Sequence, residues 1–153
     1  MHAFLLSTHS IVRWLVLILA IVAIILNFKG WLSKGTFEKR NRGVNAAYIG
    51  TLHLQLLIGF ILYGGASPLM KQILADFKTA MKVAEWRFWA VEHITLMVFA
   101  VIFAQVAQIL SKRSEDDAAK FKKAAIGFTI SLVLILAAIP WPFRSVGRPL
   151  FPF

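Results

Sequence analysis

The chain has 153 residues, of which 59% are hydrophobic and 16% are charged, and it contains no cysteine. This composition and the long apolar runs predict one integral membrane domain over residues 1–153. The absence of cysteine excludes disulfides, thiolate metal sites, iron–sulfur clusters and covalently attached haem. The formal net charge of +10 is typical of basic loops beside anionic lipid, and we expect no binding of nucleic acid.

Four apolar runs are each long enough to cross a bilayer. They predict spans over about 9–28, 45–64, 87–110 and 121–139. The predicted fold class is therefore an all-α integral membrane protein, a bundle of four transmembrane helices. No signal-peptide cleavage site follows the first run, so we expect this helix to stay in the mature protein. From Ala124 to its end before Pro140 the fourth run holds no ionisable residue, and we assign it a packing role.

Between the second and third spans, apolar residues recur at intervals of three and four over about 68–83, and lysines fall between them. This pattern predicts a short amphipathic helix that lies in the membrane interface. The segment after Pro140 mixes aromatic residues, arginine and proline. We expect it to lie as an irregular anchor at the level of the lipid headgroups.

Basic residues predict the orientation of the bundle. Ten lie in the first and third loops: Lys29, Lys34, Lys39, Arg40, Arg42, Lys112, Arg113, Lys120, Lys122 and Lys123. Six lie on the other side: Lys71, Lys78, Lys82, Arg87, Arg144 and Arg148. Because cytoplasmic loops carry the excess of lysine and arginine, we predict that the first and third loops face the cytoplasm and that both termini lie outside.

Ionisable side chains inside the spans are the candidates for chemistry, since such groups are costly in lipid. The third span opens with Glu92 and His93, and the second contains His53. With a rise of about 1.5 Å per residue, both histidines are predicted in the outer half of the bilayer. Two neutral imidazoles on different helices, without cysteine, suit the two axial positions of a non-covalent haem b. We therefore predict His53 and His93 as the metal ligands.

Small residues near these histidines leave room for a flat porphyrin. Gly50 precedes His53 by one turn, and Ala90 precedes His93 by one turn. Trp89 and Met97 are predicted to line the edges of the haem. The alternative is that the small residues serve helix packing and that the histidines form hydrogen bonds between helices.

The first helix adds two further candidates, His9 and Arg13, one turn apart on one face. We predict that Arg13 pairs with Glu92 or binds a haem propionate; alternatively, it snorkels to the headgroups. His9 and Glu92 are the predicted catalytic residues, which relay a proton from quinol near the outer face. The alternative is a structural ion pair between Arg13 and Glu92, with His9 at the surface.

Four segments of the chain carry a resemblance to a known family: HSIVRW at 9–14, TLHLQLLIG at 51–59, RFWAVEH at 87–93 and AIPWPFR at 138–144. Together they resemble, over nearly the whole chain, short bacterial four-helix membrane proteins labelled cytochrome b. The chain is more loosely similar to cytochrome b561-type bundles. This resemblance implies haem b, electron exchange with quinol and a place in the bacterial inner membrane. Those bundles carry two haems at opposite faces, whereas this chain has no histidine in its predicted cytoplasmic half.

The sequence therefore predicts a multi-pass membrane cytochrome of b type in electron transfer. Its expected partners are the lipid bilayer, quinol or quinone, and other membrane redox subunits. Two alternatives stay open: an accessory subunit without catalysis, and a metal-binding or transport protein that uses His2, His9, His93 and Glu92. Motifs of hydrolases, transferases and nucleotide-binding proteins are absent from the sequence.

Overall fold

The computed structural model describes residues 1–151, and four long apolar helices dominate it. They are α1 (His2–Leu32), α2 (Lys39–Ile61), α6 (His93–Lys112) and α7 (Asp117–Ala138). A π-helical turn, η1 (Leu62–Ala66), lengthens α2, while α5 (Ala84–Arg87) and a second π-helical turn, η2 (Phe88–Glu92), precede α6. The four continuous segments contain 31, 28, 29 and 22 residues, each long enough to cross a bilayer. The predicted four-span membrane bundle is confirmed.

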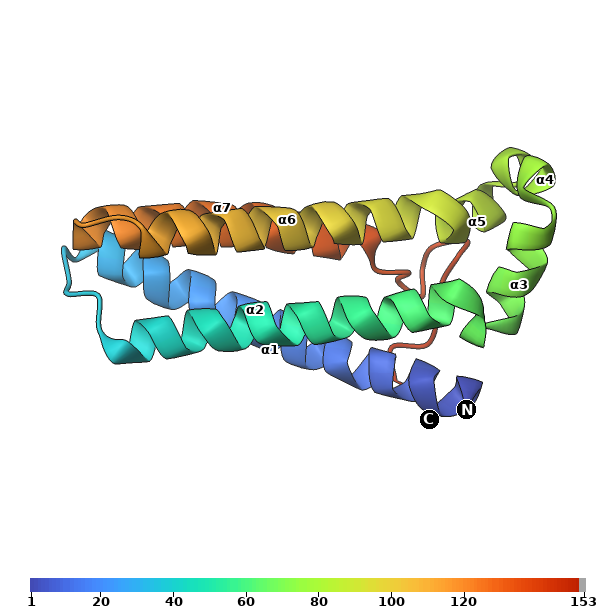
Figure 1. Cartoon of the computed structure of the whole chain (residues 1–153), viewed down its shortest axis with the longest axis horizontal. Coiled ribbons are helices and arrows are strands. Elements are labelled where there is room, and N and C mark those ends of the chain that lie inside the picture. The colour runs from blue at the N-terminus through green and yellow to red at the C-terminus, as the bar shows by residue number, and fades with distance from the viewer. Residues whose placement is uncertain (152–153) are drawn as a thin grey trace.

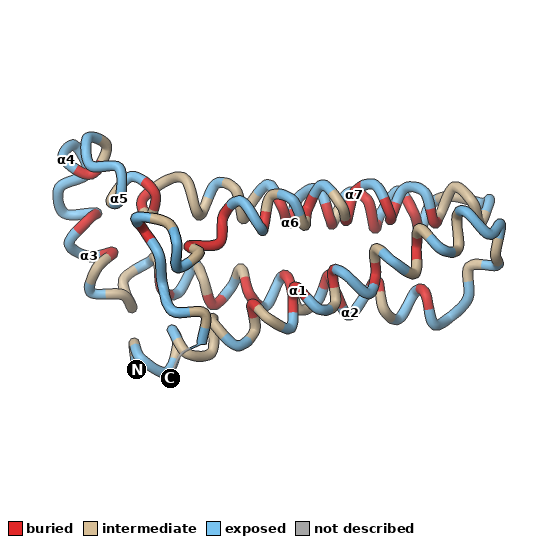
Figure 2. The backbone as a smooth tube through the Cα atoms, turned by 180° about the vertical axis from the view of Figure 1, so that it is seen from behind, coloured by how far each residue is buried: buried red, intermediate tan, exposed pale blue. Residues whose placement is uncertain are grey.

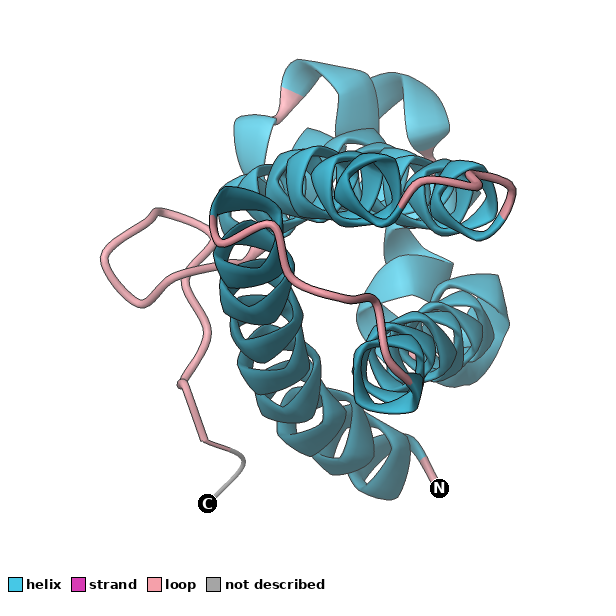
Figure 3. Ribbon diagram, turned by 90° about the vertical axis from the view of Figure 1, so that its left-hand side faces the viewer, coloured by secondary structure: helices cyan, strands magenta, loops and turns pink. Residues whose placement is uncertain are grey.

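The N-terminus and the described residues that follow α7 lie at one end of the bundle, the end that also holds the short helices α3 (Pro68–Ala75) and α4 (Phe77–Lys82). The opposite end holds the two loops that join α1 to α2 and α6 to α7 (Figure 1). α6 packs along α7, and α1 contacts both α7 and α2. α1 runs obliquely, adjoining α7 near the loops and diverging from it toward the N-terminus (Figures 1 and 3). The bundle is therefore closely packed at one end and splayed at the other.

Small residues allow α6 and α7 to approach closely. Ala100, Ala104 and Ala107 are buried on α6, and Figure 2 shows the line of buried positions along both helices. A Cβ atom added to Gly127 would lie 2.1 Å from the Cβ of Ala107, so only glycine fits there. Small residues at such contacts are a general device of helix packing in membranes.

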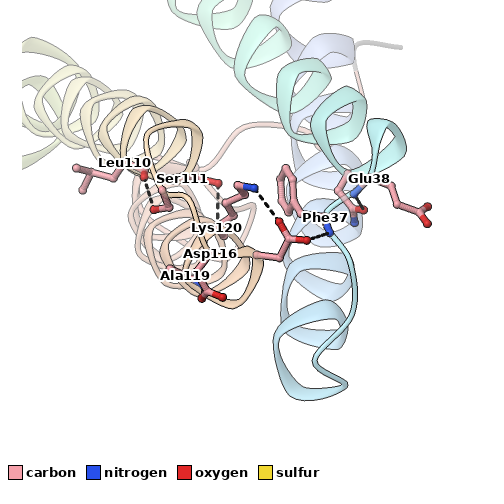
Figure 4. A network of polar contacts seen from close by, with 10 residues as sticks. Phe37, Glu38, Leu110, Ser111, Asp116, Ala119 and Lys120 are labelled. Carbon is pink, nitrogen blue, oxygen red and sulfur yellow. Dashed lines mark hydrogen bonds and ion pairs between the residues drawn. The ribbon is translucent and has the colours of Figure 1, made fainter.

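Polar side chains in the closely packed part bind one another. Asn27 Nδ2 donates to Asn45 Oδ1 at 2.7 Å between α1 and α2, and the hydroxyl groups of Tyr48 and Ser131 lie 2.8 Å apart. At the loops, Asp117 Oδ2 accepts from the backbone N–H of Phe37 at 3.0 Å (Figure 4). Hydrogen bonds thus join α1, α2, α7 and the first loop in this part of the bundle.

The helix predicted over 68–83 is present as two short helices. Asp76 leaves the helical region at φ −132° and ψ 72°, and its side chain accepts from the Thr79 backbone N–H at 3.1 Å at the start of α4. Hydrogen bonding to Thr79 lowers the pKa of the Asp76 carboxyl group. Aspartate is a favoured N-cap, so it ends the first helix by starting a second one. Gly65, with φ 131°, makes the preceding turn out of η1.

Candidate functional site

The splayed end of the bundle contains a cavity of about 750 Å³. Its walls come from α1, α2, η1, α3, η2, α6 and the segment after α7. Most of the lining is apolar; the side chains with polar atoms are those of His2, Ser7, His9, Ser10, Arg13, Gln55, Tyr63, Ser67, Trp89, His93 and Arg148. Among residues 1–151 no carboxylate lines the cavity. Its volume is within the usual range of small-molecule and cofactor sites.

His93 has the best-defined geometry in this cavity. Its Nδ1 atom lies 2.8 Å from the carbonyl oxygen of Ala138, at the last turn of α7. This carbonyl lacks a helical donor because residue 142, four positions on, is proline and has no N–H. A carbonyl oxygen only accepts, so Nδ1 carries the hydrogen and the Nε2 lone pair of His93 stays available.

Two aromatic rings also fix the orientation of His93. The ring centroids of Phe88 and Trp89 lie 5.8 and 5.7 Å from that of His93. Both aromatic residues belong to the π-helical turn η2, which ends where His93 begins α6. Single π-helical turns often occur at functional sites, since they rotate the following residues relative to a regular helix.

His9 lines the same cavity from α1. Its Nδ1 atom is buried and has no hydrogen-bond partner among the described residues. The neighbouring wall is α2, where Gln55 Nε2 donates to the His9 carbonyl oxygen at 3.0 Å. A Cβ atom added to Gly59 would lie 3.4 Å from His9 Cε1, so the imidazole occupies space beside a residue without a side chain. Gln55 is only 7% exposed, and its Oε1 atom also has no partner among residues 1–151.

Arg13 lines the cavity as well and is buried, with 9% of its surface exposed. Its guanidinium group donates to the carbonyl oxygen of Leu150, which also accepts from Trp14 Nε1 at 3.0 Å. The prediction that Arg13 pairs with Glu92 is wrong. Glu92 Oε1 binds Arg87 Nε at 2.9 Å at an exposed position. Arg87 directly precedes η2, and the wider π-helical turn brings residues five apart onto one face.

Of the other predicted site residues, Trp89 and Met97 line the cavity, and Ala90, Gly50 and His53 do not. Ala90 is buried, belongs to a separate cluster with Met70, and its carbonyl oxygen accepts from Tyr63 at 2.8 Å. Gly50 and His53 lie on the exposed face of α2. The structure therefore does not bring His53 and His93 together; the histidines that share a cavity with His93 are His2 and His9, both on α1.

Helical geometry explains why His53 does not line the cavity. Residues 53 and 55 are about 200° apart around a helix, so only one of them faces the interior. Leu52 and Ile58 are buried at 2% and 7% exposure, and Gln55 lies between them on the same stripe. Sequence reasoning missed Gln55 as a site residue, although its spacing of three from both Leu52 and Ile58 was a readable signal.

The segment after α7 also contributes to the site. Arg148 lines the cavity, and its guanidinium carbon lies 5.2 Å from the ring centroid of Trp89. The ring of Phe151 stacks on that of Trp14 at 5.4 Å. This segment was predicted only as an anchor in the headgroup region. Its position against α1 depends on contacts between residues more than 130 positions apart, for which the sequence carries no local signal.

Among residues 1–151, no three histidine, cysteine, aspartate or glutamate side chains form a group that could hold a metal ion. His2, His9, His93 and Glu92, the residues of the metal-binding alternative, thus do not form such a group. Comparisons with protein families, with curated proteins and with solved structures find no match to this chain.

Proposed function

We propose that the chain is a b-type membrane cytochrome that binds one haem b non-covalently in this cavity, where His9 and His93 would hold its iron, and that it acts in electron transfer. One observation carries the proposal. Histidines from two helices, His2 and His9 of α1 and His93 of α6, line one apolar cavity, and the Nδ1 hydrogen of His93 is bound to a backbone carbonyl. Metal-ligating histidines usually make such a bond, because it fixes the tautomer and the ring orientation.

The chemistry of the cavity fits this group. Haem has a large apolar ring and two anionic carboxylates, and the cavity has an apolar wall with Arg13 and Arg148. The guanidinium groups are suitable partners for the carboxylates, since no competing carboxylate among residues 1–151 lines the cavity.

Bound haem would supply a one-electron redox centre. The bond from His93 to Ala138 would hold the imidazole in place. The segment 140–151 would help to keep water away, because Pro140, Pro149 and Phe151 cover part of the cavity. Burial and axial ligands are the main means by which a protein tunes such a centre.

We place the electron partner, quinol or another membrane redox subunit, at the same end of the bundle. In this proposal His9 is a ligand, so of the two predicted relay residues only Glu92 keeps that role; it pairs with Arg87 outside the cavity and directly precedes His93. The basic loops at the other end favour the cytoplasm for that end. The site would then lie near the outer face of the bacterial inner membrane, with both termini outside.

The test is the absorption and pyridine-haemochrome spectrum of the protein purified from a membrane fraction. We expect low-spin haem b in the wild type and in His53→Ala, and its loss in His9→Ala and His93→Ala. His53→Ala is a matched control because it removes an imidazole from the exposed face of α2. Haem at full occupancy in both His9→Ala and His93→Ala would overturn the proposed ligands, and a wild type without haem would overturn the function.

Orientation has a separate test. Tags inserted after Lys34 and after Glu115 should report the cytoplasm, and a tag after Phe153 should report the outside. The opposite labelling would move the cavity to the cytoplasmic face and exclude an electron partner at the outer face.

A further inference from the structure

We infer that Gln55 is the positioning residue for His9: its amide oxygen accepts the Nδ1 hydrogen of the imidazole and leaves Nε2 free to face the cavity. This inference deepens the proposed function and, as far as it concerns a ligand, rests on it. It also makes a claim about the protein alone, namely the tautomer of His9.

Gln55 is held beside His9 by a bond that uses one end of its amide. Nε2 donates to the His9 carbonyl oxygen at 3.0 Å, and the side chain is 7% exposed. The amide oxygen is the end that remains. It has no partner among residues 1–151, although an acceptor this deeply buried is costly to leave without a donor.

The imidazole of His9 also has a nitrogen without a hydrogen-bond partner in residues 1–151. Its Nδ1 atom is buried and has no partner among the described residues. If Nε2 carried the hydrogen, Nδ1 and the oxygen of Gln55 would both be acceptors and both would stay unsatisfied. If Nδ1 carries the hydrogen, it is a donor and the Gln55 oxygen is an acceptor, so one bond between them would satisfy both atoms. A single tautomer therefore resolves both unsatisfied groups.

This arrangement would give His9 and His93 the same Nδ1–H tautomer, with a different acceptor for each. The Nδ1 hydrogen of His93 binds the backbone carbonyl of Ala138, which mutation of a side chain does not remove. The acceptor for His9 is a side chain and can be changed. Gln55 therefore offers separate experimental control of one of the two histidines.

The first experiment reads the tautomer in the haem-free protein by 15N NMR of labelled histidine in detergent micelles. We expect Nδ1–H for His9 in the wild type, loss of this preference in Gln55→Leu, and its return in Gln55→Glu, which keeps an acceptor oxygen. Gln108→Leu is the matched control, because Gln108 is a glutamine buried to a similar degree, 5% exposed, outside the cavity. An Nε2–H tautomer in the wild type, or an unchanged tautomer in Gln55→Leu, would overturn the inference.

The second experiment titrates the haem-free proteins with haem. Loss of a group that orients a metal ligand typically costs about 10- to 100-fold in affinity, so Gln55→Leu should bind haem at least about tenfold more weakly than Gln108→Leu. Gln55→Glu should restore affinity and lower the midpoint potential, because a carboxylate acceptor makes the imidazole a stronger electron donor. Equal affinity of the two leucine variants would overturn the positioning role.

The two experiments separate this inference from the proposed function. A wild type that binds no haem, yet shows an Nδ1–H tautomer that depends on Gln55, would overturn the function and support the hydrogen bond. A wild type that binds haem with a tautomer independent of Gln55 would do the reverse. If Gln55→Leu loses its helical circular dichroism, Gln55→Glu and the wild-type tautomer still decide the question.

Discussion

The closely packed end of the bundle, which holds the two loops, is called here the loop half, and the splayed end with the cavity the cavity half. The two halves differ in whether their buried polar groups have hydrogen-bond partners. In the loop half, Asn27 binds Asn45. In the cavity half, Gln55 Oε1 and His9 Nδ1 have no partner among the described residues. Buried polar groups in a membrane span are costly in both halves, but of these two pairs only Asn27 and Asn45 offset that cost with a hydrogen bond to each other. The difference separates polar side chains that already bind each other from polar side chains whose hydrogen bond depends on the tautomer of His9.

Glycines show the same contrast. Gly127 in the loop half has no room for a methyl group, since a Cβ would lie 2.1 Å from Ala107 Cβ. Gly59 in the cavity half would place its Cβ at an ordinary 3.4 Å from His9 Cε1. The loop half is thus a packed interior, and the cavity half keeps space that its own side chains do not fill. Four substitutions test this contrast, in order of their expected effect on stability.

The largest effect is expected for Gly127→Ala. The added methyl group overlaps Ala107 and forces α6 and α7 apart, at a cost of about 1–3 kcal/mol for overpacking. Thermal unfolding in detergent, followed by circular dichroism, measures it. Gly50→Ala is the control, because nothing lies within 4 Å of its added Cβ. Equal midpoints for the two variants would remove the packing contrast between the halves.

A smaller loss is expected for Asn27→Leu. It leaves Asn45 without its partner, and hydrogen bonds between membrane helices average about 0.6 kcal/mol and reach about 1.7. The double variant with Asn45→Leu should lose less than the sum of the two single variants, since no buried amide is then left unsatisfied. A double-mutant cycle of unfolding midpoints checks this coupling. Additive losses would mean that the pair does not act as a unit.

A near-zero change in the free energy of unfolding is expected for Gly59→Leu, even though leucine is larger than the alanine introduced by Gly127→Ala. The side chain enters open space, and leaving glycine improves helix propensity by about 0.8 kcal/mol. Haem binding should nevertheless fall sharply, because the leucine occupies the cavity beside His9. The unfolding midpoint and a haem titration of the same sample check both statements. A large loss of stability would show that the cavity half is packed like the loop half.

Arg13→Gln is expected to leave the free energy of global unfolding almost unchanged and to act locally. It weakens the attachment of the segment after α7 to α1. A lost hydrogen bond of about 1–1.5 kcal/mol raises the detached population about five- to tenfold. Trypsin should then cut after Arg144 faster, while the unfolding midpoint stays within about one degree of wild type. Arg87→Gln, which breaks the surface ion pair with Glu92, is the control. Equal cleavage rates would show that Arg13 does not hold the segment.

The sequence predicts the number of spans, because length and hydropathy decide whether a helix can cross a bilayer, but α1 (His2–Leu32) is longer than the predicted span over about 9–28. It does not predict which face of each helix points inward. Lipid tails and the helix interior are both apolar, so the pattern that reveals the buried face of a soluble helix is nearly absent. Only the spacing of three from Leu52 and Ile58 favours Gln55 over His53 as the interior residue, and the chemistry of histidine outweighs so weak a signal in the prediction.

The pairing of Arg13 with Glu92 failed for a different reason. The sequence predicts both residues near the outer ends of their spans, but depth in the membrane does not fix the direction of a side chain. In the structure, the π-helical turn η2 gives Glu92 a nearer partner, Arg87. Grouping His9 with Arg13 succeeded because it needed only a regular helix: four residues apart, both line the cavity. Local geometry was predictable, whereas contacts between distant segments were not.

The attachment of Leu150 to Arg13 also bears on the order of events during synthesis. These residues are 137 positions apart, and at about 5–20 residues per second the ribosome needs roughly 7–30 s to make the chain between them. For that time α1 exists without the segment that later covers it. The wall at Arg13 is completed only after Leu150 has been made, so a cofactor delivered before then would meet an open groove, and one delivered afterwards would have to displace a cover.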